Sequence, residues 1–229
     1  MPDRESRTNF DHSPCYREGL HAPTKSGRQW CRTNGPASRV GGSPQSVAAP
    51  SAPSVLPPDD TVAAQIRERR TAAARRYQPS RIRLLLVAQA PPEADDRYFY
   101  FPDVAQHDWL FRAVVQALLP GVELTRDNKS ALLEQLRDGG VFLIDLKPDP
   151  IVNSRDSLAE LRPHVPALLQ RIAELGPERI ILIKTDVYDA VYTALAVAGL
   201  PVSKVRIPFP SHGQQEKFRV AFGRALAGE

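Results

Sequence analysis

Four short apolar runs occur along the chain, and segments with a helical pattern lie between them. The first three runs are nearly continuous in Ile, Leu and Val, which is typical of parallel strands that are buried on both faces. We expect all four runs to be strands: Ile82–Ala88, Val141–Leu146, Arg179–Lys184 and Val202–Ile207.

Apolar residues recur at helical spacing in five segments between and after these runs. Gly139–Gly140, Gly176–Pro177 and Gly199 each follow such a segment and mark a helix end. The predicted helices cover residues 108–119, 129–137, 165–175, 186–198 and 214–226. Strands that alternate with helices imply crossovers that leave a parallel sheet between layers of helices. We therefore expect an α/β fold with three layers, α/β/α, around a central four-stranded parallel sheet.

The first 58 residues have no such pattern. They are rich in Ser, Pro, Gly, Arg and Asn, and residues 41–58 have the composition of a linker. Such a composition cannot bury enough apolar surface to offset the entropy of the chain. We expect residues 1–58 to be a disordered basic tail and residues 59–229 to be the folded domain. A helix that is N-capped by Asp60 and stopped before Pro79 would open this domain.

Charge and cysteine content exclude little and imply no cofactor. The formal net charge of +4, from 30 basic and 26 acidic residues, permits contact with nucleic acid without requiring it. The two cysteines, Cys15 and Cys31, lack the spacing of a zinc or iron–sulfur site, so we expect neither a metal nor a cluster. No apolar run approaches the roughly 20 residues of a membrane span, and the start lacks a secretion signal. We therefore expect a cytoplasmic monomer with no membrane contact.

Polar residues follow each predicted strand. Ligands of an open parallel sheet bind at the carboxyl ends of its strands, so these segments are the candidate site. They are Gln89–Glu93, Asp145–Asp149, Lys184–Asp186 and Pro208–Gln214.

Four fragments of the chain, in this order, resemble motifs of the uracil-DNA glycosylase superfamily. Residues 87–93 (VAQAPPE) resemble the loop after the family's first strand, and residues 98–101 (YFYF) the segment that stacks an aromatic ring on the base. Residues 141–145 (VFLID) resemble the strand that reads the base edge, and residues 208–213 (PFPSHG) the late loop before the last helix. The resemblance covers about residues 81–229. It implies that the partner is DNA, and that the protein recognises a flipped uracil or otherwise deaminated or damaged base and hydrolyses its N-glycosidic bond.

The chain departs from the family pattern at two positions. Gln89 and Ala90 stand where several branches carry an acidic residue or Asn, and Phe209 stands where the late loop carries His. His212 lies three residues further on. These departures favour a second hypothesis, a catalytically inactive member that binds nucleic acid or a nucleotide. A third hypothesis is hydrolysis or transfer on a free nucleotide.

Gln89, Asp145 and His212 are the candidate catalytic residues. Cleavage of an N-glycosidic bond needs a positioned water and a group that stabilises negative charge on the departing base. Gln89 could orient the water through its carbonyl oxygen, or instead bond the loop backbone, and His212 could stabilise the base. Glu93 is an alternative carboxylate.

Asp145 would end a strand directly after four apolar residues, where a carboxylate is costly unless it is paired or functional. An ionised carboxylate only accepts hydrogen bonds, which favours a base with an exocyclic amine over the O4 of uracil. Asp145 could otherwise act as an acid or base, cap the next turn, or pair with Lys147 or Lys184.

Seven further residues are candidates for binding the base or DNA. Phe99 or Phe101 could stack on a base, because alternate residues point opposite ways if the segment is extended; core packing is the alternative. Lys147 and Lys184 suit phosphate or a developing anion, with surface pairing as the alternative. Amides at the start of the last helix could hold an anion; the residues there are Ser211, Gly213 and Gln214.

Overall fold

The computed structural model describes residues 58–104, 109–125, 127–151, 157–211 and 213–229. The tail prediction for residues 1–58 therefore falls almost wholly outside the described residues, and so does His212.

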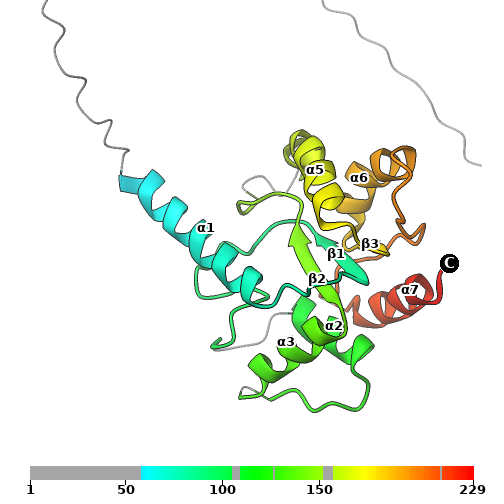
Figure 1. The fold of residues 1–229 in the computed structure, drawn as a ribbon, viewed down its shortest axis with the longest axis horizontal. Helices are drawn as coiled ribbons and strands as arrows, with labels where there is room; N and C mark the ends of the chain where they lie inside the picture. Colours follow the sequence, from blue (N-terminus) through cyan, green and yellow to red (C-terminus); the bar gives the residue numbers. More distant parts are fainter. Residues whose placement is uncertain (1–57, 105–108, 126, 152–156, 212) are drawn as a thin grey trace, which may run out of the picture. The chain divides into compact units, whose positions relative to one another are not determined.

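The central sheet contains three strands. They are β1 (Leu84–Ala88), β2 (Val141–Asp145) and β3 (Ile180–Leu182), in the order β2-β1-β3, and all pairs are parallel (Figure 1). Every residue of β1 is buried, because β1 has a strand on each side and helices on both faces. The register aligns Ala88 with Asp145, so the carboxyl ends of β1 and β2 lie level with each other.

The prediction of a fourth strand is not confirmed. The segment from Val202 to Ile207 makes only two isolated parallel bridges to the third strand, Ile180 with Val202 and Ile183 with Ile207. Between these bridges the segment advances five residues while its partner advances three, so the two backbones cannot keep a regular ladder. The Ser203 hydroxyl also accepts a hydrogen bond from the Val205 N–H at 3.2 Å, which bends the backbone locally. The α/β class holds with a smaller sheet.

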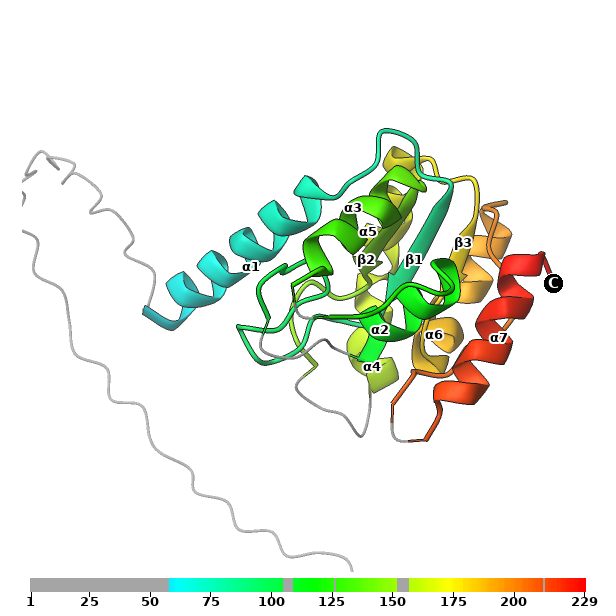
Figure 2. The same cartoon turned by 90° about the horizontal axis from the view of Figure 1, so that it is seen from below.

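Helices cover both faces of this sheet, as Figures 1 and 2 show. One layer holds α2 (Trp109–Leu118), α3 (Lys129–Asp138) and α7 (Gln215–Ala227). The other layer holds α4 (Ser157–Leu161), the 3-10 helix η2 (Arg162–His164), α5 (Val165–Leu175) and α6 (Thr185–Val197). The helices predicted from the pattern agree with the observed ones to within one residue at each end, whereas α4 and η2 were not predicted.

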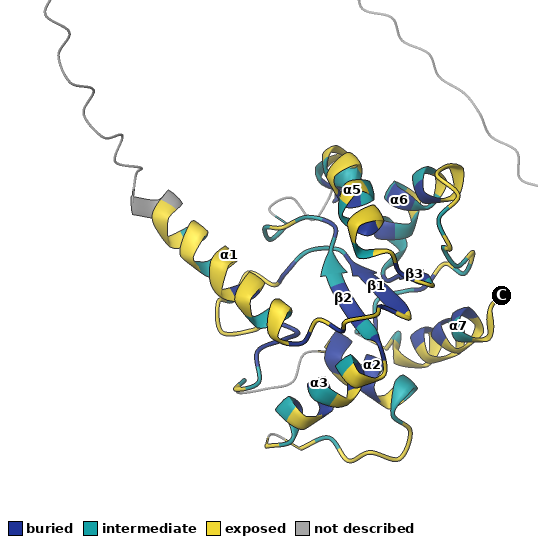
Figure 3. Ribbon diagram, in the orientation of Figure 1, coloured by how far each residue is buried: buried dark blue, intermediate teal, exposed yellow. Residues whose placement is uncertain are grey.

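Helix α1 (Pro58–Arg76) stands apart from the two layers and extends away from the sheet (Figure 2). It begins two residues before Asp60, the predicted N-cap, and ends before Pro79 as expected. Most of its residues are exposed (Figure 3), and among those whose burial is described only Arg70 is buried, with 5% of its surface accessible.

A turn over Tyr98–Phe101 protects the outer edge of β2. The Tyr100 hydroxyl donates to the Leu143 carbonyl at 3.0 Å and accepts the Leu143 N–H at 2.7 Å, which satisfies backbone groups that an edge strand otherwise leaves open. The Phe101 N–H donates to the Tyr98 carbonyl at 3.1 Å, so the segment is a turn and all four of its side chains are buried. The alternation of an extended segment therefore does not apply to Phe99 and Phe101.

Candidate functional site

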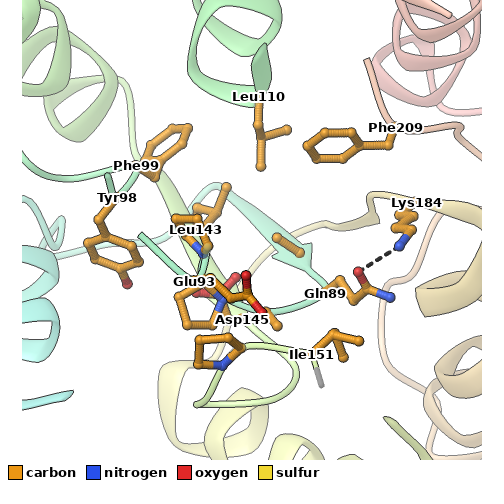
Figure 4. Close-up of a pocket in the computed structure, with 15 residues that line it drawn as sticks. Gln89, Glu93, Tyr98, Phe99, Leu110, Leu143, Asp145, Ile151, Lys184 and Phe209 are labelled. Carbon is orange, nitrogen blue, oxygen red and sulfur yellow. Dashed lines mark hydrogen bonds between the residues drawn. The ribbon is translucent and has the colours of Figure 1, made fainter. Parts of the chain in front are cut away.

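The strand ends meet at a cavity of about 340 Å³. This volume is at the lower end of the roughly 300–1,000 Å³ that small-molecule sites occupy. Its walls come from the residues after β1, the Tyr98 turn, the start of α2, the end of β2 and the loop before α7 (Figure 4). The lining residues with polar side chains are Gln89, Glu93, Tyr98, Asp145 and Lys184. The apolar ones are Ala88, Ala90, Pro91, Pro92, Phe99, Leu110, Leu143, Pro150, Ile151 and Phe209.

Four of the predicted site residues line this cavity together: Gln89, Phe99, Asp145 and Lys184. They come from three different strand ends and the Tyr98 turn, and their meeting is a consequence of the parallel sheet. Glu93, which was considered as an alternative carboxylate, also lines the cavity and is exposed, so it lies at the mouth.

Five other predicted residues do not line the cavity. Phe101 is buried under the guanidinium of Arg69, 4.5 Å from the ring centre. Lys147 donates from Nζ to Glu160 Oε2 at 2.8 Å. The remaining three, Ser211, Gly213 and Gln214, form the turn before α7.

That turn positions Phe209. The Ser211 N–H donates to the Phe209 carbonyl at 2.9 Å, and the Gln214 N–H donates to the Ser211 carbonyl at 3.0 Å. Gly213 has φ of +77°, a conformation that residues with a Cβ adopt at a cost. The turn thus contributes an aromatic wall to the cavity.

Aromatic and aliphatic groups form one side of the cavity. Phe99 packs edge-to-face on Phe111, with ring centroids 5.5 Å apart, and this contact fixes its orientation. Figure 4 shows Phe99 and Phe209 on either side of Leu110. Both rings belong to the wall of the cavity, and Phe99 is buried.

Gln89, Lys184 and Asp186 form a polar network at another part of the wall. Lys184 Nζ donates to Gln89 Oε1 at 2.6 Å and lies 3.3 Å from Asp186 Oδ2 (Figure 4 shows the first contact). The Gln89 amide group lies 3.5 Å from the same carboxylate oxygen. Both ends of the Gln89 amide are therefore held by charged neighbours. The Gln89 side chain therefore bonds Lys184 and Asp186 and not the loop backbone, the alternative that the sequence left open.

Asp186 anchors this network. The Ser157 hydroxyl donates to Asp186 Oδ2 at 2.6 Å. Partial burial acts to raise the pKa of Asp186, but the hydrogen bond from Ser157 and the charge of Lys184 outweigh it, so the pKa lies below its usual value. The carboxylate is therefore ionised at neutral pH and holds Lys184 in place. Ser157 was not foreseen as a site residue, because it begins the unpredicted helix α4.

Lys184 has an unusual backbone conformation. Its φ is +80°, the only positive value among the non-glycine residues that the structure describes. It links β3 to α6, so the chain turns sharply here from the sheet into the helix. Non-glycine residues with such angles cost of order 1–3 kcal/mol and cluster at functional sites.

The Asp145 backbone is tied to α5. Arg171 Nη2 donates to the Asp145 carbonyl at 3.0 Å and to the Leu146 carbonyl at 3.1 Å. Burial lowers the pKa of Arg171, and the Asp145 carboxylate opposes that shift. The lysines considered as partners of Asp145 pair elsewhere, Lys147 with Glu160 and Lys184 with Asp186.

Tyr98 presents a neutral hydroxyl close to Asp145. Burial raises the pKa of this phenol, and the charge of Asp145 raises it further. A phenol that stays protonated can donate as well as accept a hydrogen bond. The site therefore combines two carboxylates, a cation, an amide and a neutral hydroxyl.

Two further features concern metals and membranes. Within the described ranges, no group of three or more His, Cys, Asp and Glu side chains could hold a metal ion. None of the helices in these ranges is both long enough and apolar enough to cross a membrane.

Comparison with protein-family models and with curated proteins gave no match for this chain.

Proposed function

We propose that the cavity binds one flipped base of DNA, uracil or another deaminated or damaged base, and that the protein hydrolyses the N-glycosidic bond of that base. The observation that carries the proposal is the convergence of three strand ends on a cavity with aromatic walls, two carboxylates and a lysine.

The base stacks between the rings of the apolar wall. Stacking of a base on an aromatic side chain contributes roughly 1–3 kcal/mol, and every base has a face suited to it. Phe99 is already held by Phe111, so little ordering of the ring is needed when the base enters.

Asp145 reads the edge of the base. An ionised carboxylate accepts hydrogen bonds and cannot donate them, so it selects a base that carries an exocyclic amine or a ring N–H. Tyr98, whose raised pKa keeps its hydroxyl protonated, supplies a donor beside it.

Hydrolysis uses the groups at the mouth and at the Lys184 network. Glu93 takes a proton from a water that attacks the C1′ atom of the sugar, while the bond from C1′ to the base nitrogen breaks and leaves its electron pair on the base. The charge of Lys184 offsets the negative charge that develops on the base, and Gln89 and Asp186 keep the lysine oriented. The departing base then takes up a proton from Glu93 or from water, so the products are a free base and an abasic sugar.

The test uses the full chain and oligonucleotides that carry uracil, hypoxanthine or xanthine. Abasic sites are detected by strand cleavage in alkali. We expect Glu93→Gln to slow release of the base at least 100-fold, because a general base contributes roughly 10²–10⁴-fold. Asp145→Asn replaces an acceptor by a group that also donates, so we expect it to change which base is preferred. Asp138→Asn is the matched control, since Asp138 is exposed and pairs with Arg137 away from the cavity. Unchanged activity and preference in the Glu93 and Asp145 variants would refute the assignment.

A second candidate is a protein that binds a base without cleaving it. The two-sided hold on Gln89 favours this candidate, because an amide bonded to both Lys184 and Asp186 is less free to orient water. Binding of base-containing oligonucleotides that Phe99→Ala weakens, with no abasic product from any substrate, would establish it.

A further inference from the structure

A second hollow lies directly beside the cavity, on the side of α1. It measures about 600 Å³ and runs between α1, the end of β2 and α5. Four residues belong to the walls of both hollows: Pro91, Tyr98, Leu143 and Asp145. We call this second hollow the arginine groove, because Arg67, Arg70, Arg75 and Arg171 line it.

Arg70 carries a buried charge with incomplete pairing. Only 5% of its surface is exposed, yet the nearest carboxylate oxygen, from Asp95, is 3.9 Å from Nη2 and belongs to a side chain that is 60% exposed. Nη2 donates to the Pro92 carbonyl at 2.8 Å, while the buried Nε has no hydrogen-bond partner among the described residues. Burial of a charge without a close counter-ion is costly, so this guanidinium is a site for an anion.

Positive charges outnumber negative ones in the lining of the groove. The four arginines face two carboxylates in the wall, Asp145 and Glu174. Arg67 reaches Asp149 Oδ1 at 2.9 Å, but both side chains are about half exposed, so the pair is weak. Arg75 is exposed at the rim of the groove, where its guanidinium is accessible to a ligand.

We propose that the arginine groove holds phosphate groups of the same ligand whose base enters the cavity. The inference rests on the base-binding part of the proposed function, because the two hollows share the wall that contains Asp145. Arginine suits phosphate because its planar N–H groups match two phosphate oxygens at once. The phosphates can come from a DNA strand or from a free nucleotide, and the experiment separates these sources.

The test measures binding with Arg67→Ala/Arg75→Ala, a double variant that removes two exposed charges and leaves buried Arg70 in place. Affinity for a fluorescent single-stranded oligonucleotide is followed over a series of salt concentrations. We expect affinity to fall at least 10-fold at low salt. The slope of log K against log salt should decrease by up to about 1.4, since each lost phosphate contact on a single strand reduces it by about 0.7.

Two controls separate groove binding from general charge effects. Asp149→Asn breaks the same Arg67 ion pair but keeps the guanidinium, so binding should be unchanged or tighter. Arg219→Ala/Arg224→Ala removes two exposed charges from α7, in the helix layer that does not border the groove, and should weaken binding less than the groove variant.

The source of the phosphate follows from a second arm with a nucleoside and its 5′-monophosphate, measured by calorimetry. A loss of affinity for the monophosphate but not the nucleoside in the groove variant indicates a free nucleotide. A loss for oligonucleotides alone indicates a strand. Affinity of both ligand types equal to wild type would overturn the groove proposal.

The groove proposal and the base proposal fail separately. An oligonucleotide with an abasic site tests the groove without a base. Phe99→Ala and Phe209→Ala change the wall of the cavity alone, so they test the cavity without altering the groove. If only the arginine variant weakens binding, the groove stands and the base site is wrong. If only the cavity variants weaken it, the groove is wrong.

Discussion

At the scale of single residues, Asp186 fixes the position of the charged side chain in the cavity wall. It is not itself a wall of the cavity, but it fixes Lys184 at 3.3 Å and receives the Ser157 hydroxyl at 2.6 Å. A carboxylate in this position keeps the lysine side chain in one rotamer, as residues that support a functional site commonly do.

The depressed pKa of Asp186 makes its contribution depend on pH. A carboxyl group whose folded pKa lies below its usual value of 3.8 stabilises the fold above that pH, and the contribution is lost as the pH falls through the lower folded pKa. We expect Asp186→Asn to cost about 1 kcal/mol at pH 7, and the gap to wild type to narrow below about pH 4. Urea unfolding at a series of pH values measures this gap.

Ser157→Ala supplies the complementary test. Without the hydroxyl donor, the pKa of Asp186 should rise, and carbon NMR of the carboxyl group reports it directly. A gap between Asp186→Asn and wild type that stays constant from pH 7 to pH 2, or a pKa unchanged by Ser157→Ala, would contradict this account.

At the scale of elements, the outer edge of β2 depends on one hydroxyl. Tyr100 satisfies both the N–H and the C=O of Leu143 from a completely buried position, and burial raises the pKa of its phenol. The phenol therefore stays protonated at neutral pH and remains a donor.

Tyr100→Phe should destabilise the fold by about 2 kcal/mol or more, because two buried backbone groups lose their partner while the packing volume is kept. Tyr188→Phe is the control: its hydroxyl donates at 3.0 Å to the Lys204 carbonyl at an exposed site, so the loss should be below about 1 kcal/mol. The midpoint of urea unfolding should shift with an unchanged slope. Equal losses in the two variants would show that edge protection is not the reason.

Most elements could be predicted because periodicity alone specifies them. Helix α5, for instance, runs from Val165 to Leu175 as expected and ends at Gly176 in the left-handed conformation. Residue types could not show that the segment from Val202 to Ile207 does not form a regular strand. The segment has two more residues than its partner between the two bridges, and this mismatch is not visible in the sequence pattern. Helix α4 has only five residues, too few for a periodic signal.

At the scale of the whole molecule, the hydrophobic core of the described residues extends from Tyr77 to Ala225. The buried apolar side chains of the sheet and of the helix layers that the structure describes all belong to this range. Cooperative unfolding should therefore depend on residues 58–229.

Deletion of residues 1–57 should leave the midpoint and the slope of urea unfolding unchanged, because the slope scales with the surface that folding buries. A full-length chain compared with the truncated one, both followed by circular dichroism and fluorescence, provides the measurement. A smaller slope for the truncated chain would mean that residues 1–57 bury surface on folding.

The candidate site was predictable in its strand-end residues and not in its surroundings. Gln89, Asp145 and Lys184 follow apolar runs, and a parallel sheet must bring such ends together. The run from Arg67 to Arg70 indicated a solvated helix face that could lie along phosphates. The groove beside the cavity was not predicted, because the burial of Arg70 depends on packing and not on its residue type. The Ser157 contact likewise joins residues 29 positions apart, which no local pattern records.

Because the two hollows share the wall at Asp145, one ligand can bind in both at the same time. A substrate that spans the wall binds at two sites, and binding at one site raises the effective concentration of the substrate at the other. Cleavage of the glycosidic bond divides that bivalent ligand into two fragments, each of which is held at only one site. Weaker retention of both products than of the intact substrate would then arise from the architecture itself, without any movement of the protein.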